Sequence, residues 1–89
     1  MRHRLDFDPD CWAEEYTYWE LHDVKMIRKI HRLLDDIDRN GHEGIGKPEP
    51  LRHNLHGWWS RRITEAHRLV YRFDDDFIHI LHCRNHYND

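Results

Sequence analysis

The chain has 89 residues, 38% of them hydrophobic, a length that suits one domain (residues 1–89) with one core and excludes several independent folding units. Four Trp, four Tyr and three Phe exclude a disordered chain, and no apolar run approaches the roughly 18 residues of a membrane span, so we expect a cytoplasmic protein without a membrane partner. The net charge of −3 hides a basic stretch over residues 44–72, between two acidic ones, which predicts contact with a polyanion at one place.

The first elements that the sequence predicts are a short strand and a helix. Residues 2–7 alternate polar and apolar side chains, which is typical of a strand with one buried face. Asp8-Pro9 is a helix-start signal, because Asp accepts hydrogen bonds from free N–H groups and Pro needs none in the first turn. Trp12, Tyr16 and Trp19 then follow at the spacing of one apolar helix face, which we expect to lie in the core.

A second helix is expected between Asp23 and Asn40-Gly41. Its apolar positions recur at helical spacing, and the Gly after Asn is a common helix end. This stripe too predicts packing in the core and not a cofactor site. Its members are Met26, Ile27, Ile30, Leu33, Leu34 and Ile37.

The rest of the chain predicts a loop and an antiparallel meander. Residues 44–50 combine two glycines with two prolines and are expected to form a loop without a phosphate-binding motif. Four β-prone stretches follow, at residues 51–55, 58–64, 67–73 and 77–83. Together with the first strand, they predict an α+β fold in which both helices cover one face of a mostly antiparallel sheet.

Alternation along these strands predicts which residues face away from the helices. In residues 67–73 the odd positions are apolar and the even positions include Arg68 and Arg72. We therefore expect the even positions to form a cationic outer face of the sheet. On the last strand we expect the even positions, including His82 and His86, to share this outer face.

Glu49 is the one acid between Lys47 and Arg62, and it is held between two prolines. Restricted backbone angles on both sides favour a firmly placed carboxylate, as catalysis requires. A carboxylate base, arginines and the His86 imidazole fit cleavage of RNA by attack of a 2′-hydroxyl on the adjacent phosphate, without a metal or cofactor. The alternative is a surface ion pair between Glu49 and Arg52 or Arg62.

A metal site is the rival chemistry at the C-terminal end. His79, His82, Cys83 and His86 have ligand-like spacing. On an extended strand they divide between two faces, so we expect no metal there. Cys11 and Cys83 form no paired motif, and we expect two buried or inert thiols.

Five segments of the chain carry a family resemblance. They read GKPEPL at 46–51, HNL at 53–55, GWWSRRIT at 57–64, HRLVY at 67–71 and CRNHY at 83–87. They closely resemble the YoeB/Txe-type toxins, which belong to the RelE superfamily of toxin–antitoxin endoribonucleases.

The resemblance implies a RelE-like α+β fold and an activity. Such toxins cleave mRNA in the ribosomal A site and halt translation until a YefM/Phd-like antitoxin neutralises them. Operator DNA is then reached only through the antitoxin, and a homodimer is expected because relatives are often dimeric.

The resemblance also implies roles for individual residues. By position, Glu49 matches the general base, Arg68 the group that stabilises the transition state, and His86 the general acid. The residues expected to bind or orient RNA are Lys47, Arg52, His53, Arg62 and Tyr87.

The sequence departs from the family pattern near the expected site. Ala66 stands where an acidic residue is common, and Asn85 where an aromatic is common, while Asn88-Asp89 extend beyond the usual final Tyr. These departures leave two alternatives open: a catalytically inactive RNA- or ribosome-binding module that blocks translation by occupancy, and a pure interaction partner of a DNA-binding antitoxin.

Overall fold

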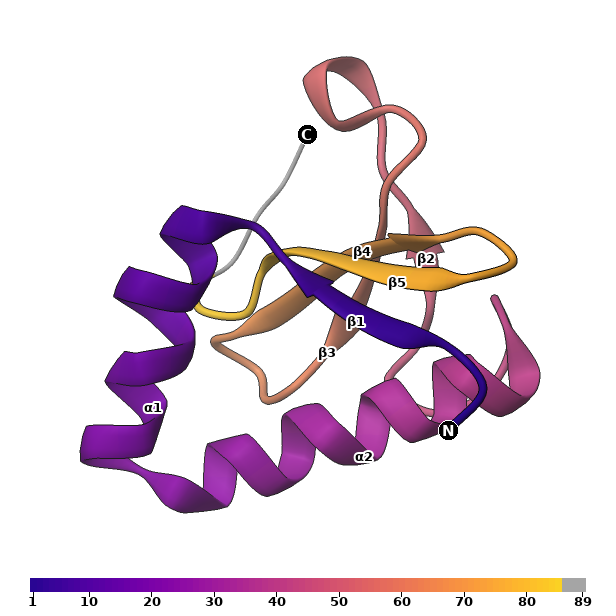
Figure 1. Ribbon diagram of the computed structural model, residues 1–89. Coiled ribbons are helices and arrows are strands. Elements are labelled where there is room, and N and C mark those ends of the chain that lie inside the picture. The colour runs from indigo at the N-terminus through magenta and orange to yellow at the C-terminus, as the bar shows by residue number, and fades with distance from the viewer. Residues whose placement is uncertain (86–89) are drawn as a thin grey trace.

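The computed structural model describes residues 1–85 and has two helices packed against a five-stranded sheet (Figure 1). This arrangement confirms the α+β prediction. Within these residues no helix is both long and apolar enough to cross a bilayer. In chain order the elements are β1 (Arg4–Phe7), the π-helical turns η1 (Cys11–Tyr16), α1 (Thr17–His22), α2 (Val24–Asn40), β2 (Glu49–Pro50), the 3-10 turn η2 (His53–Leu55), β3 (Trp59–Arg62), β4 (Arg68–Phe73) and β5 (Phe77–His82).

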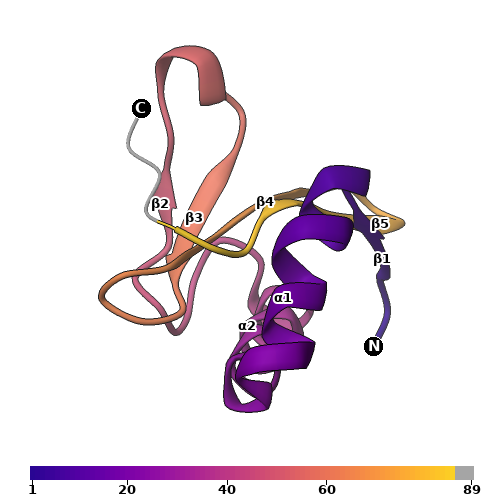
Figure 2. The ribbon, with the colours of Figure 1, turned by 90° about the vertical axis from the view of Figure 1, so that its left-hand side faces the viewer.

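The sheet has the strand order β1-β5-β4-β3-β2. β1 runs parallel to β5, and all the other neighbours are antiparallel. α2 lies along one side of the sheet, while the connection between β2 and β3 extends away on the opposite side (Figures 1 and 2). The C-terminal half therefore forms a meander, and β1 closes it at the far edge.

The predicted helix boundaries are confirmed by the caps. The Asp8 carboxylate accepts hydrogen bonds from the backbone N–H groups of Asp10 and Cys11 at 3.1 and 3.2 Å. Asp23 does the same for Lys25 at the start of α2. Gly41 ends α2 with a φ of 66°, a left-handed conformation that favours Gly.

The first helical segment differs from its predicted face at one position. Cys11 is completely buried, and Trp12, predicted in the core, is 45% exposed and stacks on Tyr16. The reason is that Cys11–Tyr16 winds as a π-helix with i→i+5 hydrogen bonds, and this wider winding buries Cys11, five positions before the buried Tyr16. Tyr16 and Trp19 are buried as predicted.

The predicted strand over residues 51–55 is wrong. The strand pairing lies earlier, at Glu49–Pro50, and residues 53–55 form η2. Leu51 closes the pairing by donating its backbone N–H to the Trp58 carbonyl at 2.9 Å. His53 then adopts a φ of 53°, which a strand does not allow.

The prediction that the even residues of the last strand lie on the outer face is also wrong for the regular part of β5. Ile78 and Ile80 are buried in the core, so the even positions of β5 face the helices. Between Val70 and Tyr71 the register shifts by one: Tyr71 pairs with Ile80 and Val70 with His82, so the extra residue of this bulge is Leu81 of β5. Cys83, beyond the end of β5, is buried as well.

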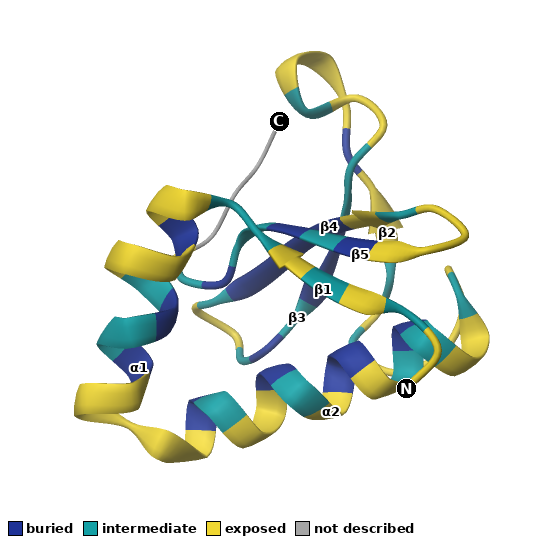
Figure 3. Cartoon of the chain, viewed as in Figure 1, coloured by how far each residue is buried: buried dark blue, intermediate teal, exposed yellow. Residues whose placement is uncertain are grey.

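The core lies between the helices and the sheet, as the burial pattern of Figure 3 shows. It includes one charged side chain, Arg61 of β3, which is completely buried. The Arg61 guanidinium forms an ion pair with Asp36 of α2 and donates to the Tyr71 hydroxyl at 3.1 Å. It also donates to the backbone carbonyls of Gly41, Glu43 and Ile45.

Replacing Asp36 with Asn is expected to destabilise the fold by about 3 kcal/mol, because a buried guanidinium loses its counter-charge. Although burial acts to raise it, the pKa of Asp36 is lowered by the hydrogen bonds from Arg61, Ile45 and Asn40, so the carboxylate is the form that is bound. Chemical unfolding at neutral pH measures the difference. Asp35→Asn, exposed on the same helix, is the matched control and should change stability by less than about 0.5 kcal/mol. Equal effects of the two variants would contradict this assignment.

Candidate functional site

The strand register brings three of the predicted site residues to the outer face of the sheet. Glu49 of β2 pairs with Ser60 of β3, and Arg62 lies two residues further along β3 on the same face. Arg62 in turn pairs directly with Arg68 of β4. Glu49 and the two arginines therefore share one face although they come from three strands.

Two arginines directly opposite each other are unfavourable in a sheet, because like charges on a cross-strand pair repel. Arg62 makes only a distant ion pair, 3.9 Å, with the almost fully exposed Glu65. The Arg68 side chain is held by the carbonyl oxygens of Thr64 and Glu65, which accept from its Nη1 at 2.8 and 3.1 Å. The register therefore places two cationic residues next to each other on the outer face.

Arg68 differs from the expectation in its exposure. It lies on the predicted face but is only 8% exposed, because the loop from Thr64 to His67 wraps around its side chain. Such packing fixes the guanidinium position before a ligand arrives.

The other predicted site residues are more scattered. Lys47 precedes β2 with a φ of 52° and is exposed, as is Glu49. Arg52 and His53 are exposed in the extension between β2 and β3 and do not lie in the sheet itself. His86 and Tyr87 lie outside the described residues.

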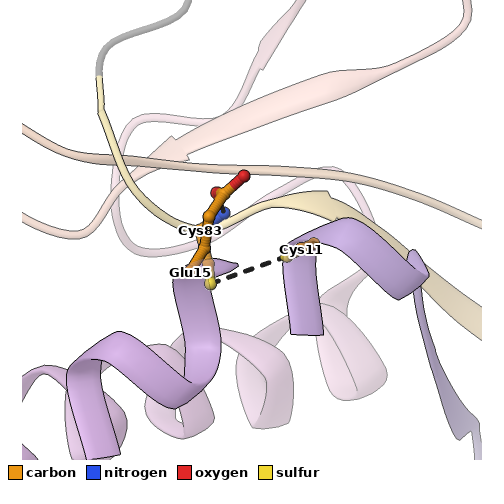
Figure 4. A group of neighbouring side chains, drawn as sticks. All are labelled: Cys11, Glu15 and Cys83. Atoms are coloured by element: carbon orange, nitrogen blue, oxygen red, sulfur yellow. Dashed lines mark hydrogen bonds between the residues drawn. The ribbon is translucent and has the colours of Figure 1, made fainter. Parts of the chain in front are cut away.

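The segment just before His86 is held by a carboxylate from the first helical segment. Glu15 Oε1 accepts hydrogen bonds from the backbone N–H groups of Cys83 and Arg84 at 2.8 and 3.0 Å. Glu15 Oε2 lies 3.0 Å from His82 Nδ1. Figure 4 shows Glu15 beside Cys83 and the nearby Cys11.

Further contacts complete this C-terminal anchor, by which we mean the contacts that hold residues 83–85. Trp19 Nε1 donates to the Cys83 carbonyl at 2.9 Å, and the Arg84 guanidinium lies 3.5 Å from the centre of the Tyr18 ring. Asn85 donates its backbone N–H to His67 Nδ1 at 2.8 Å. Asn85 has a φ of 72°, a left-handed conformation that Asn tolerates better than most residues.

One contact joins the C-terminal anchor to the outer face. The backbone N–H of Arg68 donates to the Asn85 carbonyl at 2.9 Å. Asn85 immediately precedes His86 in the sequence. The chain is thus fixed beside Arg68 at the residue before the predicted acid.

Cys11, Glu15 and Cys83 are the one group within residues 1–85 whose ligand atoms lie close enough to hold a metal ion. The two thiols are completely buried, 3.7 Å apart, and in hydrogen-bond contact (Figure 4). The hydrogen bond with Cys83 and burial raise the pKa of Cys11, which favours the neutral thiol. Both Glu15 oxygens already have partners, so this group acts as part of the C-terminal anchor. The expectation of buried thiols is confirmed.

Two histidines of the rival metal hypothesis, His79 and His82, contact carboxylates, and the third, His86, lies outside the described residues. His79 lies between the Asp6 and Asp74 carboxylates, with its ring nitrogens at 2.7 and 3.0 Å from them, and these contacts raise its pKa. His82 contacts Glu15.

Sequence reasoning missed Glu15, Trp19 and His67 as residues that organise the site. Glu15 and Trp19 are four residues apart and so project from the same side of the helical segment, where a carboxylate beside an apolar stripe is unusual. That signal was available. The hydrogen-bond partners of Glu15 and Trp19, however, lie more than 60 positions away along the chain. No local sequence pattern reveals contacts at that separation.

Comparison with known proteins identifies the same family that the sequence resembles. A family model described as "YoeB-like toxin of bacterial type II toxin-antitoxin system" matches residues 7–87. The chain is 54% identical over 84 residues to the toxin YoeB of Escherichia coli K12, covering 94% of this chain and 99% of that relative.

Two solved structures from Staphylococcus aureus are similar over nearly the whole chain. A YoeB dimer is 51% identical with a TM-score of 0.91, covering 98% of this chain and 100% of that chain. A YoeB chain in a YoeB-YefM complex is 50% identical with a TM-score of 0.88 and the same coverage.

Replacing Glu15 with Ala is expected to loosen residues 83–85, because two backbone N–H groups lose a charged acceptor. The free energy of local opening should fall by about 1.5 to 3 kcal/mol, which makes amide exchange at Cys83 and Arg84 at least about tenfold faster. Hydrogen exchange followed by NMR measures it residue by residue. Glu14→Ala, its exposed neighbour, should leave these amides protected. Unchanged protection in Glu15→Ala would show that the carboxylate does not hold the segment.

The contact between His67 and Asn85 should weaken in acid. Burial and the neighbouring Arg84 charge lower the pKa of His67, and only the neutral ring accepts the Asn85 N–H. The stability from this group is therefore complete above the unfolded pKa of about 6.5 and is lost as pH falls through that value toward the lower folded pKa. Unfolding free energies of the native protein and His67→Gln should differ more at pH 8 than at pH 5. A pH-independent difference would refute the assignment.

Proposed function

Because this chain belongs to the family of YoeB-like toxins of bacterial type II toxin–antitoxin systems, we propose that it is a ribosome-dependent mRNA endoribonuclease that inhibits translation by metal-independent cleavage in the A site. The observation that carries the proposal is the shared outer face of Glu49, Arg62 and Arg68, to which Asn85 is hydrogen-bonded through the Arg68 backbone. A base, a cationic centre and the attachment point of His86 thus come from one side of the sheet.

The proposed reaction needs two proton transfers and stabilisation of negative charge. Glu49 removes the proton of a ribose 2′-hydroxyl, and that oxygen attacks the adjacent phosphorus. Arg68 and Arg62 stabilise the charge that builds on the phosphoryl oxygens. His86 gives a proton to the departing 5′-oxygen, so the products are a cyclic phosphate and a free 5′-hydroxyl.

The geometry favours this division of roles. Glu49 is exposed, as a base that must meet its substrate has to be, whereas Arg68 is packed and pre-positioned. Lys47, Arg52, His53 and Tyr87 remain our prediction for residues that bind the RNA strand on either side of the reacting linkage.

The antitoxin we propose is of the YefM/Phd type, because a similar chain from Staphylococcus aureus forms a YoeB-YefM complex. Contact with operator DNA is then indirect, through that antitoxin. A homodimer is also part of the proposal, since a similar chain forms a YoeB dimer.

A catalytically inactive RNA- or ribosome-binding module is the second candidate. It is favoured by Ala66, which leaves the loop around Arg68 without a carboxylate at that position. Primer extension on a translated message separates the two functions, because catalysis creates new 5′ ends and occupancy creates a reversible stall.

Glu49→Gln is expected to lower the rate of mRNA cleavage by at least about 100-fold, because the amide cannot accept the 2′-hydroxyl proton. The measurement is single-turnover cleavage of a message on programmed ribosomes. Glu43→Gln removes the same charge from an exposed side chain outside the site and should cleave at the native rate. Native-rate cleavage by Glu49→Gln would remove this residue from the mechanism.

A further inference from the structure

The N-terminal half of α2 carries four exposed cations on one side of the helix. They occupy positions i, i+3, i+4 and i+7, the spacing of a single helical face, while the opposite face of α2 packs into the core. The exposed side of α2 points away from the sheet (Figure 3). We call this set the α2 basic stripe, and its members are Lys25, Arg28, Lys29 and Arg32.

The α2 basic stripe is not explained by the stability of the helix. Both of its i, i+4 pairs, Lys25 with Lys29 and Arg28 with Arg32, are like-charged and repel. Cations near a helix N-terminus also oppose the helix dipole, and beyond the capping Asp23 the first turn of α2 has no acidic residue. Within residues 1–85 none of the four makes an ion pair.

The α2 basic stripe continues into a pocket at the end of β3. Lys29 and Arg32 line this cavity of about 210 Å³ together with Arg62. Its other lining residues are apolar or Gly, and none is acidic. At Gly46 a side chain would come within 2.9 Å of Leu33, so Gly allows the loop to lie against α2 and form the pocket wall.

Arg62 connects this pocket to the outer face. It pairs with Arg68 in the sheet and also lines the pocket beside α2. The cations of the α2 basic stripe recur about once per helical turn, or about 5.4 Å, so they can meet successive phosphates of an extended strand. A continuous row of cationic residues, complementary to the negative phosphates of RNA, thus runs from the Arg62–Arg68 pair through Lys29 and Arg32 to the outer side of α2. We call this row the binding track.

We propose that the α2 basic stripe and the Lys29–Arg32–Arg62 pocket bind the phosphate backbone of the RNA strand whose linkage occupies the Arg62–Arg68 pair, where that strand continues past the reacting linkage. This rests on the proposed function for the identity of the ligand. It does not depend on cleavage, because backbone binding through cations needs neither base nor acid.

The test is equilibrium binding of single-stranded RNA that carries a 2′-deoxy nucleotide at the reacting position and so cannot be cut. Lys29→Gln and Arg32→Gln should each weaken binding of a 12-nucleotide probe at all sequences tested. Each should also reduce the slope of log affinity against log salt by about 1. The ratio of native to variant affinity should rise with probe length from three to 12 nucleotides.

Arg39→Gln is the matched control, because it removes one positive charge from an exposed position of the same helix outside the stripe. An equal loss in Arg39→Gln would mean that net charge alone is responsible and would overturn the proposal. Native affinity in both stripe variants, checked for folding by thermal unfolding, would also overturn it. So would a loss confined to intact ribosomes or to a YefM-type antitoxin, each of which assigns the stripe to another partner.

The outcomes separate this inference from the nuclease proposal. If Glu49→Gln cleaves normally while the stripe variants lose RNA affinity, the binding track stands and the catalytic assignment falls. The reverse result leaves the catalytic assignment and removes the track.

Discussion

The buried guanidinium of Arg61 holds the helical layer and the sheet in one arrangement. Moving a cation out of water costs several kcal/mol, and the structure offsets this cost by surrounding Arg61 with Asp36, the Tyr71 hydroxyl and the carbonyls of residues 41–45. Those carbonyls belong to the loop that leads into β2. The position of Glu49 on the outer face therefore depends on an interaction on the opposite face of the sheet.

Local chemistry made the helix ends predictable, since Asp8 and Asp23 cap neighbouring N–H groups and Gly41 ends its own helix. The opposite fates of Arg61 and Arg62 were not predictable from sequence. Alternation along a strand places them on opposite faces, but the partner that makes burial of Arg61 tolerable is 25 positions away on α2.

Two of the errors in the predicted fold, the exposed Trp12 and the face of the even residues on the last strand, have one physical cause, the insertion of a residue into a regular repeat. The π-helical turns move burial from Trp12 to Cys11, and this shift is what brings the Cys11 thiol against Cys83. The bulge at Leu81 shifts the register of β5 against β4 in the same way. Periodicity predicts that an element exists, but it cannot locate such insertions, because the packing of distant segments selects them.

The acidic net charge gives a misleading picture of the surface, and α2 shows why. In its second half, Asp36 neutralises Arg61, and Asp38 accepts hydrogen bonds from the backbone of Arg2 and from His3. These acids are used inside the molecule. The cations of the first half have no such partners within residues 1–85, and the Arg62–Arg68 pair repels itself. On α2, therefore, two of the acids are paired within the fold while the four cations of its first half face outward.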